Sequence, residues 1–220
     1  MTDRDPRAPF SDLFAGGDRT DSSTAWFEQI YEAAAARSAR VPWDRGAPHR
    51  HLVEWAAKNR VYGDGKRAVV VGCGLGDDAE FVASLGFDVT AFDLAPTAIR
   101  MARERFPGSS VHYEVADLFA LPAEWHHAFD LVIENQTAQA LPAAMRPAAI
   151  AAIGALVGPG GRVLVLANRA IEGQTIAGPP WPLTEAEIAS FAQDGLAVES
   201  IERLSTNGQP RWRAVLHRIG

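Results

Sequence analysis

Residues 68–81 read AVVVGCGLGDDAEF, an apolar run followed by three closely spaced glycines and two aspartates. A glycine-rich loop directly after a buried strand typically brings its backbone close to a nucleotide. The dinucleotide-binding fingerprint has glycines at its first, third and sixth positions. Here the glycines are Gly72, Gly74 and Gly76, and Asp77 stands at the sixth position. The loop therefore disfavours a nicotinamide-dependent oxidoreductase, which remains an alternative.

The two aspartates indicate the charge of the ligand. Asp77 and Asp78 fall in the first turn of the predicted helix, where a pyrophosphate would otherwise gain from the helix dipole. Two carboxylates there would repel phosphate but attract an ammonium and a sulfonium group. S-adenosylmethionine is a nucleoside cofactor with both groups and no phosphate. The simpler alternative is that both aspartates only stabilise the helix N-terminus.

The chain around this loop alternates between short apolar runs and helical patterns. The apolar runs predict strands over residues 69–71, 88–92, 111–115, 129–133 and 162–166. Helices are predicted near residues 77–85, 96–106 and 143–156, and the GPGG sequence at 158–161 is expected to end the last of them. Continuous apolar runs are typical of strands covered on both faces, and the alternation indicates a doubly wound parallel sheet.

The end of the chain breaks this alternation. After a helix predicted near residues 184–193, strand patterns over 196–204 and 211–219 flank Asn207-Gly208, a strong turn signal. Such a hairpin would add antiparallel strands to one edge of the sheet. The sequence therefore predicts an α/β fold with a doubly wound, mostly parallel sheet and an antiparallel C-terminal hairpin.

The first sixty residues precede the predicted sheet. Residues 1–23 are polar and show no periodicity, so we expect a flexible lead-in. A helix is predicted after the candidate N-cap Thr24, and a second one near residues 48–58. The first of these helices carries large apolar residues at helical spacing, namely Trp26, Phe27, Ile30 and Tyr31.

Bulk composition limits the class of protein. The chain has 220 residues, 47% of them hydrophobic, which suits one domain with a sizeable core. A net charge of −6 argues against nucleic-acid partners, which normally select a basic surface. No stretch is long and apolar enough for a membrane span, and MTDRDPRAPFSDLF lacks the apolar core of a signal peptide. The single cysteine, Cys73, favours a reducing cytoplasm, and no His or Cys spacing indicates a metal.

Two further aspartates follow the next strands. Asp93 ends the second predicted strand, 21 positions after Gly72, where a carboxylate could accept the ribose hydroxyl hydrogens. Asp117 follows the third strand and could accept the adenine amino group, with Leu118 and Phe119 covering the ring. A helix cap at Asp93 and a solvated acid at Asp117 are the simpler alternatives.

The motifs GCGLG, FDL and ADL, in this order and spacing, resemble those of class I S-adenosylmethionine-dependent methyltransferases over residues 66–167. The terminal hairpin is similar to the reversed last strand of that family. The resemblance implies one methyltransferase domain over residues 1–220 with a seven-stranded, Rossmann-like sheet and a catalytic core from residue 66 onward. It assigns S-adenosylmethionine to Gly72, Cys73, Gly74, Gly76, Asp77, Asp93, Leu94, Asp117, Leu118 and Glu134.

Segments outside the core narrow the resemblance. WFEQIY, VPWDRGAPHRHLVEW and ENQTAQALPAAMR resemble stretches of thiopurine and thiol S-methyltransferases. The resemblance implies that residues 24–60 form a helical lid and that Arg146 and Trp181 face the methyl acceptor. In the lid, Trp26 and Trp43 would lie over the cofactor with Asp44 and Gly46. A cation–π contact with the sulfonium and ordinary core packing are equal alternatives for the two tryptophans.

The expected reaction is methyl transfer to a small molecule, possibly a thiol. A thiol needs no dedicated base, whereas a hydroxyl would, and Glu134 is the candidate. Glu134-Asn135-Gln136 stands where some relatives have Asp or Tyr-Asp, so we expect a different substrate. The absence of an Asn-Pro-Pro-Tyr sequence there weighs against adenine, glutamine or nucleic-acid N-methylation. A natural-product O- or N-methyltransferase and a non-catalytic S-adenosylmethionine-binding module remain alternatives. The oligomeric state is undetermined by the sequence.

Overall fold

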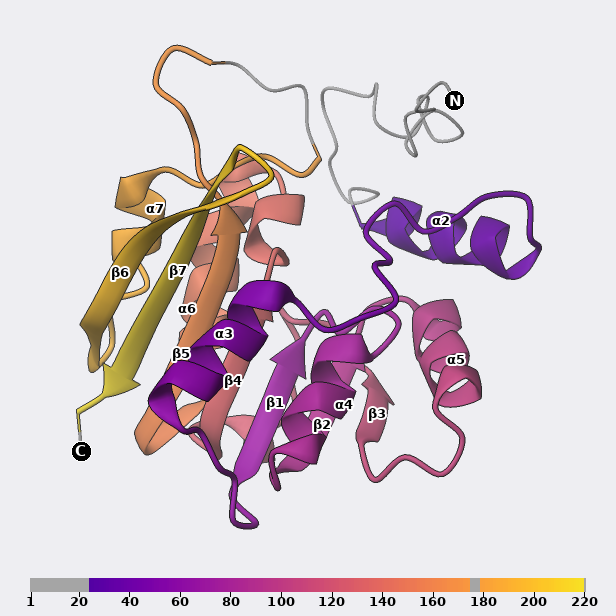
Figure 1. Cartoon of the computed structure of the whole chain (residues 1–220), viewed down its shortest axis with the longest axis horizontal. Coiled ribbons are helices and arrows are strands. Elements are labelled where there is room, and N and C mark those ends of the chain that lie inside the picture. The colour runs from indigo at the N-terminus through magenta and orange to yellow at the C-terminus, as the bar shows by residue number, and fades with distance from the viewer. Residues whose placement is uncertain (1–23, 175–178, 220) are drawn as a thin grey trace.

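Seven strands form one sheet within residues 24–174 and 179–219, the part of the chain that the computed structural model describes. Their order is β3-β2-β1-β4-β5-β7-β6 (Figure 1). Five strands run parallel: β1 (Arg67–Val71), β2 (Asp88–Asp93), β3 (His112–Val115), β4 (Phe129–Asn135) and β5 (Val157–Asn168). The hairpin of β6 (Leu196–Thr206) and β7 (Gln209–Arg218) joins β5 through an antiparallel pairing. The predicted fold class is confirmed.

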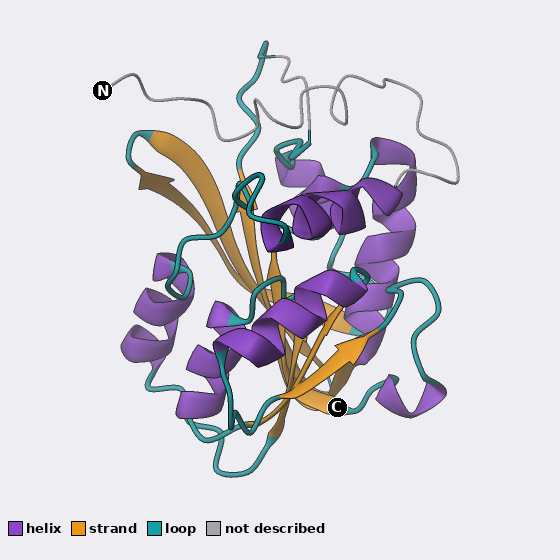
Figure 2. Ribbon diagram, turned by 90° about the vertical axis from the view of Figure 1, so that its right-hand side faces the viewer, coloured by secondary structure: helices purple, strands orange, loops and turns teal. Residues whose placement is uncertain are grey.

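Helices cover both faces of this sheet, which Figure 2 shows nearly edge-on. Side chains of a strand alternate between the two faces, so Ala68 and Val70 pack on one side and Val69 and Val71 on the other. The first face is covered by α3 (Arg50–Asn59), α4 (Asp77–Ser84) and α5 (Pro96–Arg105). The opposite face is covered by α6 (Arg146–Leu156) and α7 (Glu185–Ala189). This double covering explains the continuous apolar runs of the parallel strands.

Helix α2 (Ala25–Ala35) lies outside these two layers and beside α5 (Figure 1). Its apolar face packs on Leu75, Ala95 and Ala98 and so forms a third, smaller apolar cluster. The Glu28 carboxylate accepts hydrogen bonds from the Thr97 amide at 3.1 Å and the Thr97 hydroxyl at 2.6 Å, in the first turn of α5. A carboxylate is favourable at this positive end of a helix. The expected N-cap Thr24 precedes α2 but makes no side-chain capping bond.

The segment GPGG belongs to β5, although the sequence pattern favoured a helix stop outside the strand. Helix α6 ends at Leu156, and Val157 already pairs with Phe129 of β4. A Cβ atom on Gly158 would lie 2.9 Å from the His127 carbonyl oxygen, and one on Gly161 would lie 2.7 Å from that of Phe129. These glycines therefore permit a close approach of two backbones.

Two helices differ from their predicted bounds. The segment expected as one helix over 143–156 begins with a separate 3₁₀ turn, Ala143–Met145, before α6. Helix α7 ends at Ala189 and is shorter than the predicted 184–193. The Ser190 hydroxyl donates back to the Glu187 carbonyl at 2.8 Å, a local bond that competes with continued helix.

Candidate active site

A cavity of about 780 Å³ lies at the carboxyl ends of the parallel strands, where ligands bind in doubly wound sheets. It extends from the loops after β2 and β3, past β1 and β4, to the end of β5 and the start of β7. Most residues assigned to the cofactor from sequence line it: Trp26, Trp43, Gly72, Cys73, Gly74, Gly76, Asp77, Asp93, Leu94, Asp117 and Leu118.

The glycines of the loop after β1 are required by its backbone. Gly72, Gly74 and Gly76 have φ angles of 58°, 54° and 91°, in the region that side chains disfavour. A Cβ atom on Gly72 would lie 2.6 Å from the Thr137 hydroxyl oxygen, and one on Gly74 would lie 3.1 Å from the Tyr31 hydroxyl oxygen. The loop therefore presents bare backbone to the cavity.

Asp93 holds this loop from beneath. One carboxylate oxygen accepts from the Gly74 amide and the other from the Ala95 amide, each at 3.0 Å. Burial raises the pKa of Asp93 from 3.8 to about 6, although these bonds oppose the shift. Each oxygen keeps a further lone pair, so a bond to a ribose hydroxyl is compatible with the observed ones. The ribose contact remains a prediction.

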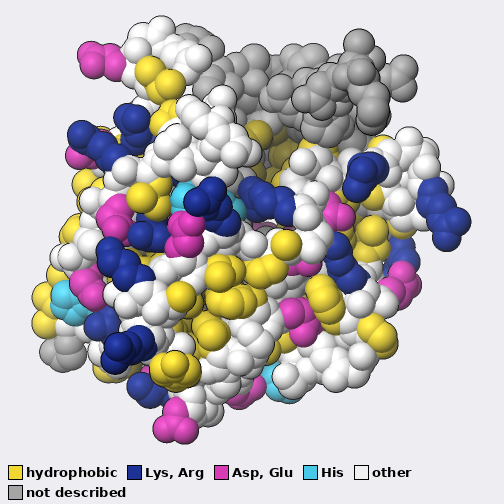
Figure 3. All heavy atoms as spheres, viewed as in Figure 1, with side chains coloured by type: hydrophobic (Ala, Val, Ile, Leu, Met, Phe, Trp, Pro, Cys, Tyr) yellow, Lys and Arg dark blue, Asp and Glu magenta, His cyan; other side chains and the backbone are white. Residues whose placement is uncertain are grey.

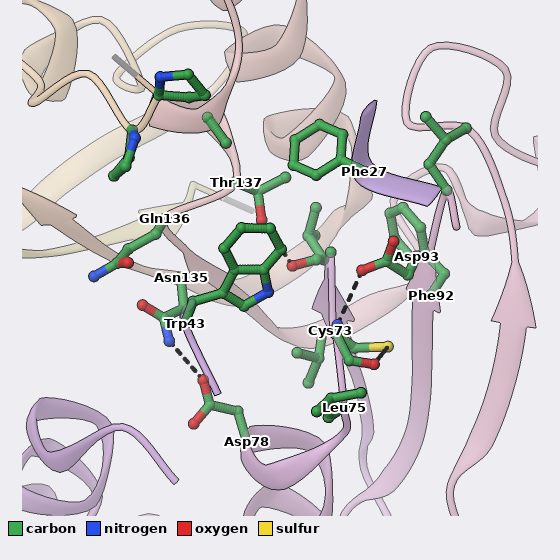
Figure 4. A pocket seen from close by; sticks show the side chains of 18 of the residues that line it. Phe27, Trp43, Cys73, Leu75, Asp78, Phe92, Asp93, Asn135, Gln136 and Thr137 are labelled. Atoms are coloured by element: carbon green, nitrogen blue, oxygen red, sulfur yellow. Dashed lines mark hydrogen bonds between the residues drawn. The ribbon is translucent and has the colours of Figure 1, made fainter. Parts of the chain in front are cut away.

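Asp78 and Asn135 form a polar pair where β1 and β4 lie side by side and the strand order reverses (Figure 4). The Asp78 carboxylate accepts from the His49 amide at 2.6 Å and from the Asn135 side-chain amide at 2.7 Å. The Asn135 side-chain oxygen is buried and has no hydrogen-bond partner among the described residues. A free acceptor beside a carboxylate suits a ligand ammonium group. Sequence reasoning assigned no ligand role to Asn135, although its place at the end of a central strand was a usable signal.

Aromatic side chains cover the loop. The Trp43 indole N–H donates to the Tyr31 hydroxyl at 2.9 Å, and Trp26 stacks on Phe27 with ring centroids 3.9 Å apart. Trp43 lies between Asn135 and Asp93 in the close view of Figure 4. Burial and the nearby Asp93 raise the pKa of Tyr31 well above its ordinary value, so its hydroxyl stays protonated. Phe27 and Tyr31 line the cavity too. Sequence analysis placed both on this helix face without assigning them to the site.

Asp77 shares one arginine with a second carboxylate of the cavity. Its carboxylate lies 3.4 Å from the Arg105 guanidinium, which also contacts Asp44 at 3.1 Å. Arg105 thereby links the segment after α2 to the first turn of α4. One positive charge faces two carboxylates here, so Asp77, Asp78 and Asp93 together keep the surroundings of the glycine loop negative.

Glu134 does not line the cavity, contrary to its assignment as catalytic base and cofactor ligand. Its side chain is fully buried, and one oxygen accepts from the Ala138 amide at 2.8 Å. The other oxygen is buried without a hydrogen-bond partner among the described residues. Burial raises the pKa of Glu134 from 4.5 to about 7. The carboxylate turns back onto the loop after β4, so we assign it to holding that loop.

Arg146 and Trp181 also lie outside the cavity lining and so do not support the assignment to the acceptor. The buried Arg146 guanidinium pairs with Glu187 at 2.5 Å and donates to the Leu141 carbonyl at 3.1 Å. The Trp181 amide donates to the Gln139 carbonyl at 2.8 Å. Both residues support lining segments from behind. Nothing in a one-dimensional pattern distinguishes a supporting arginine from one that faces a ligand.

Glu134 is expected to make the stability of the protein depend on pH. Its pKa is higher in the folded chain, about 7 against 4.5, so the folded state binds the proton more tightly. The free energy of unfolding should fall by up to about 1.4 kcal/mol per pH unit as the pH rises through this interval. In Glu134→Gln, whose amide oxygen can still accept from Ala138, this contribution should vanish. Chemical denaturation near pH 5 and near pH 7 measures it, and an unchanged slope in the variant contradicts the assignment.

A sheet of this topology, with a glycine loop after β1 and an acid at the end of β2, defines a class I S-adenosylmethionine-dependent methyltransferase. The chain belongs to the thiopurine S-methyltransferase family, whose family model matches residues 33–217. It is accordingly an S-adenosylmethionine-dependent methyltransferase of small molecules. No helix in the described part of the chain is long and apolar enough to cross a membrane.

Known relatives differ in the acceptors for which they are named. The chain is 28% identical to the 2-heptyl-1-hydroxyquinolin-4(1H)-one methyltransferase of Mycobacteroides abscessus, over 86% of this chain and 85% of that protein. It is 30% identical to probable thiol methyltransferase 2 of Arabidopsis thaliana, over 80% and 74% of the two chains. The solved 1,6-didemethyltoxoflavin-N1-methyltransferase of Burkholderia thailandensis, which holds S-adenosylhomocysteine, has a similar fold. Its TM-score is 0.68 at 18% identity, over 92% and 93% of the two chains.

Proposed function

We propose that the chain methylates the thiol of a small molecule and supplies no general base of its own. One observation carries the proposal. Among the described residues that line the cavity there is no histidine, lysine or glutamate. A hydroxyl or protonated amine acceptor would normally require such a group, whereas a thiol is already a few per cent thiolate at neutral pH.

The acids and other ionisable groups of the cavity are also poorly suited to act as bases. Each lining aspartate has a partner within the chain. Asp44 and Asp77 contact Arg105, and Asp117 accepts from the Phe119 amide at 2.9 Å. Asp78 and Asp93 each accept two hydrogen bonds, as described above. Burial raises the pKa of Cys73 well above its ordinary value, so this thiol stays protonated.

The chain's own residues then act by binding, orientation and exclusion of water. When bound, S-adenosylmethionine supplies a methyl group already activated by the sulfonium. Asp93 and Asp117 would hold the ribose and the adenine, and Asn135 with Asp78 would hold the ammonium group. The bare loop at Gly72–Gly76 permits close approach, and Trp43 with Tyr31 covers it. Correct positioning of two reactants can lower a barrier by about 7–11 kcal/mol.

The helical lid over residues 24–60 belongs to the same proposal. Trp26, Phe27 and Tyr31 of α2 line the cavity, and Glu28 and Arg105 tie this region to α5 and α4. These contacts support a role in excluding water from the reacting groups. Residues 1–23, expected as a flexible lead-in, lie outside the described residues. The cytoplasmic location and the absence of nucleic-acid partners remain predictions from the sequence.

A second candidate is transfer to an acidic oxygen. The mycobacterial relative is named for a 1-hydroxyquinolin-4(1H)-one, and this resemblance favours an acceptor whose hydroxyl ionises readily. Such an acceptor would also need no base from the protein. The two candidates therefore share one property, an acceptor atom that is ionised or strongly nucleophilic at neutral pH.

A panel of thiols, phenols, hydroxylated heterocycles and amines, incubated with labelled S-adenosylmethionine, tests the proposal by the masses of the products. Thiols should be methylated, and below the pKa of each thiol the rate should rise about tenfold per pH unit, with its thiolate fraction. Glu134→Gln should keep this profile. Preference for weakly acidic alcohols, with a loss of about 10²–10⁴ in turnover on Glu134→Gln, would restore Glu134 as the base and overturn the proposal.

A further inference from the structure

Two arginines line the cavity in addition to its acids. The glycine loop, Asp93 and Asp117 follow β1, β2 and β3, whereas Arg211 lies at the start of β7, opposite Asn168 of β5 in the antiparallel register. Arg45, in the segment between α2 and α3, also lines the cavity. If the cofactor occupies the ends of β1 to β3, the arginines face the space left for the acceptor.

Neither arginine has an ion-pair partner in the part of the chain that the structure describes. No described carboxylate forms an ion pair with Arg45 or Arg211. The Arg211 guanidinium contacts the uncharged side-chain oxygen of Asn168. By comparison, Arg213, two residues further along β7, pairs with Glu202 at 2.7 Å. Arg211 therefore brings positive charge to the cavity without an ion-pair partner among the described residues, and Arg45 adds to it.

The two arginines are also close enough to repel each other. Burial and the positive charge of Arg45 lower the pKa of Arg211. Burial, Arg45 and, more weakly, Arg211 lower the pKa of the adjacent His49 to about 3, so this histidine is neutral and adds no charge. Arg45 also opposes the rise in the pKa of Asp78, so this carboxylate balances part of the Arg45 charge, and Arg211 has no such neighbour within the described ranges. In the view of Figure 3, basic side chains and histidine gather above α3.

We propose that Arg45 and Arg211 form an anion subsite and that the methyl acceptor is an apolar molecule with a negative charge. Arg211 is half-buried, so its charge is unfavourable there without a counter-ion, whereas Arg45 is exposed. Guanidinium groups bind carboxylates and other planar anions well. Ala140, Leu141, Pro179 and Pro180 also line the cavity and suit an apolar body. The inference rests on the proposed function and narrows its acceptor class.

The negative charge could lie on a second group or on the nucleophile itself. The first test compares 4-mercaptobenzoate with its methyl ester, which has a thiol but no carboxylate. The second compares 4-nitrothiophenol with 4-methylthiophenol at one pH, because the nitro compound is more fully ionised. A charge on either group should be recognised by the same guanidinium pair, and the two comparisons show which one it is.

In the wild-type protein, 4-mercaptobenzoate should have a lower KM than its methyl ester, or 4-nitrothiophenol should have a lower KM than 4-methylthiophenol. Arg211→Gln and Arg45→Gln should each raise that KM about 10- to 100-fold, and should change the neutral acceptor little. Arg211→Lys, which keeps the charge, should retain most of the preference. Arg100→Gln on α5, an exposed arginine outside the cavity lining, is the matched control and should behave as wild type. Equal losses for charged and neutral acceptors would show a structural role and overturn the subsite.

A binding measurement separates this inference from the proposed function. Calorimetry with S-adenosylhomocysteine present would compare 4-(methylthio)benzoate with its methyl ester, and it needs no turnover. If the acid binds about 10-fold or more tightly than the ester in wild type but not in Arg211→Gln, the subsite is supported even when no thiol of the panel is methylated. Equal binding of acid and ester to the wild type, together with equal KM values for the more and the less ionised thiophenol, overturns the subsite.

Discussion

Replacing Asp93 with alanine is expected to reduce S-adenosylmethionine affinity at least about 100-fold and to destabilise the loop after β1. The Gly74 and Ala95 amides would lose their acceptor, and a buried donor left unsatisfied costs about 1–3 kcal/mol. The predicted ribose contact would be lost as well. Titration calorimetry measures the affinity, and amide hydrogen exchange measures the opening of the loop at residues 72–76.

Asp93→Ala should lower the free energy of unfolding by less than the summed contributions of the two lost hydrogen bonds. The pKa of Asp93 is raised from 3.8 to about 6, so its ionised form is itself unfavourable in the folded chain at neutral pH. The carboxylate therefore lowers the free energy of unfolding as the pH rises from 3.8 to about 6. Asp93→Ala should remove this pH dependence. Asp88→Ala, at the exposed other end of β2, is the control. Unchanged cofactor affinity in a folded Asp93→Ala variant contradicts the assigned role.

Gly74→Val is expected to abolish detectable cofactor binding. The φ angle of 54° is costly for a branched residue, and a Cβ atom would already lie 3.1 Å from the buried Tyr31 hydroxyl. The additional methyl groups would have to enter the space beneath Tyr31 and Trp43. We expect an affinity loss above about 100-fold, measured by calorimetry with S-adenosylhomocysteine.

Gly108→Val provides a matched comparison for Gly74→Val. Gly108 has a φ angle of 84°, but a Cβ atom there would have no heavy atom within 4 Å among the described residues. This variant carries the backbone strain without the crowding, so it should lose some stability and keep cofactor affinity. If both variants lose affinity to the same extent, strain alone accounts for the effect, and the close-approach explanation fails.

Features that depend on local sequence were predictable here. The loop at residues 72–76 lies between a strand and a helix, and all three segments follow one another directly in the sequence. Asp93 was predictable for the same reason, because the end of a parallel strand defines the edge at which its side chain lies. The hairpin after residue 195 was predictable from a turn signal between two strand patterns.

Features that depend on side-chain direction or distant contacts were not predictable. Glu134 stands one residue before Asn135, yet only Asn135 lines the cavity, because the Glu134 carboxylate turns back onto the Ala138 amide. The sequence does not show the direction that a side chain takes at the end of a strand. Arg45 and Arg211 line the same cavity only because of the tertiary fold, and no local sequence pattern relates them. Arg146 was a reasonable candidate for the site as a charged residue, but its ion-pair partner is Glu187 of α7. That contact is not visible in the sequence.

The raised pKa of Cys73 has a consequence for the proposed transfer to a thiol. Thiol–disulfide exchange requires a thiolate, and this chain has a single cysteine whose raised pKa keeps it protonated. Its half-buried side chain lines the cavity, and the Gly74 carbonyl oxygen lies 3.9 Å from the sulfur. A disulfide that enters the cavity would therefore meet a protonated thiol, which is a poor nucleophile for forming a mixed disulfide. On the proposed function, the protein would then act on redox-active compounds without becoming their redox partner.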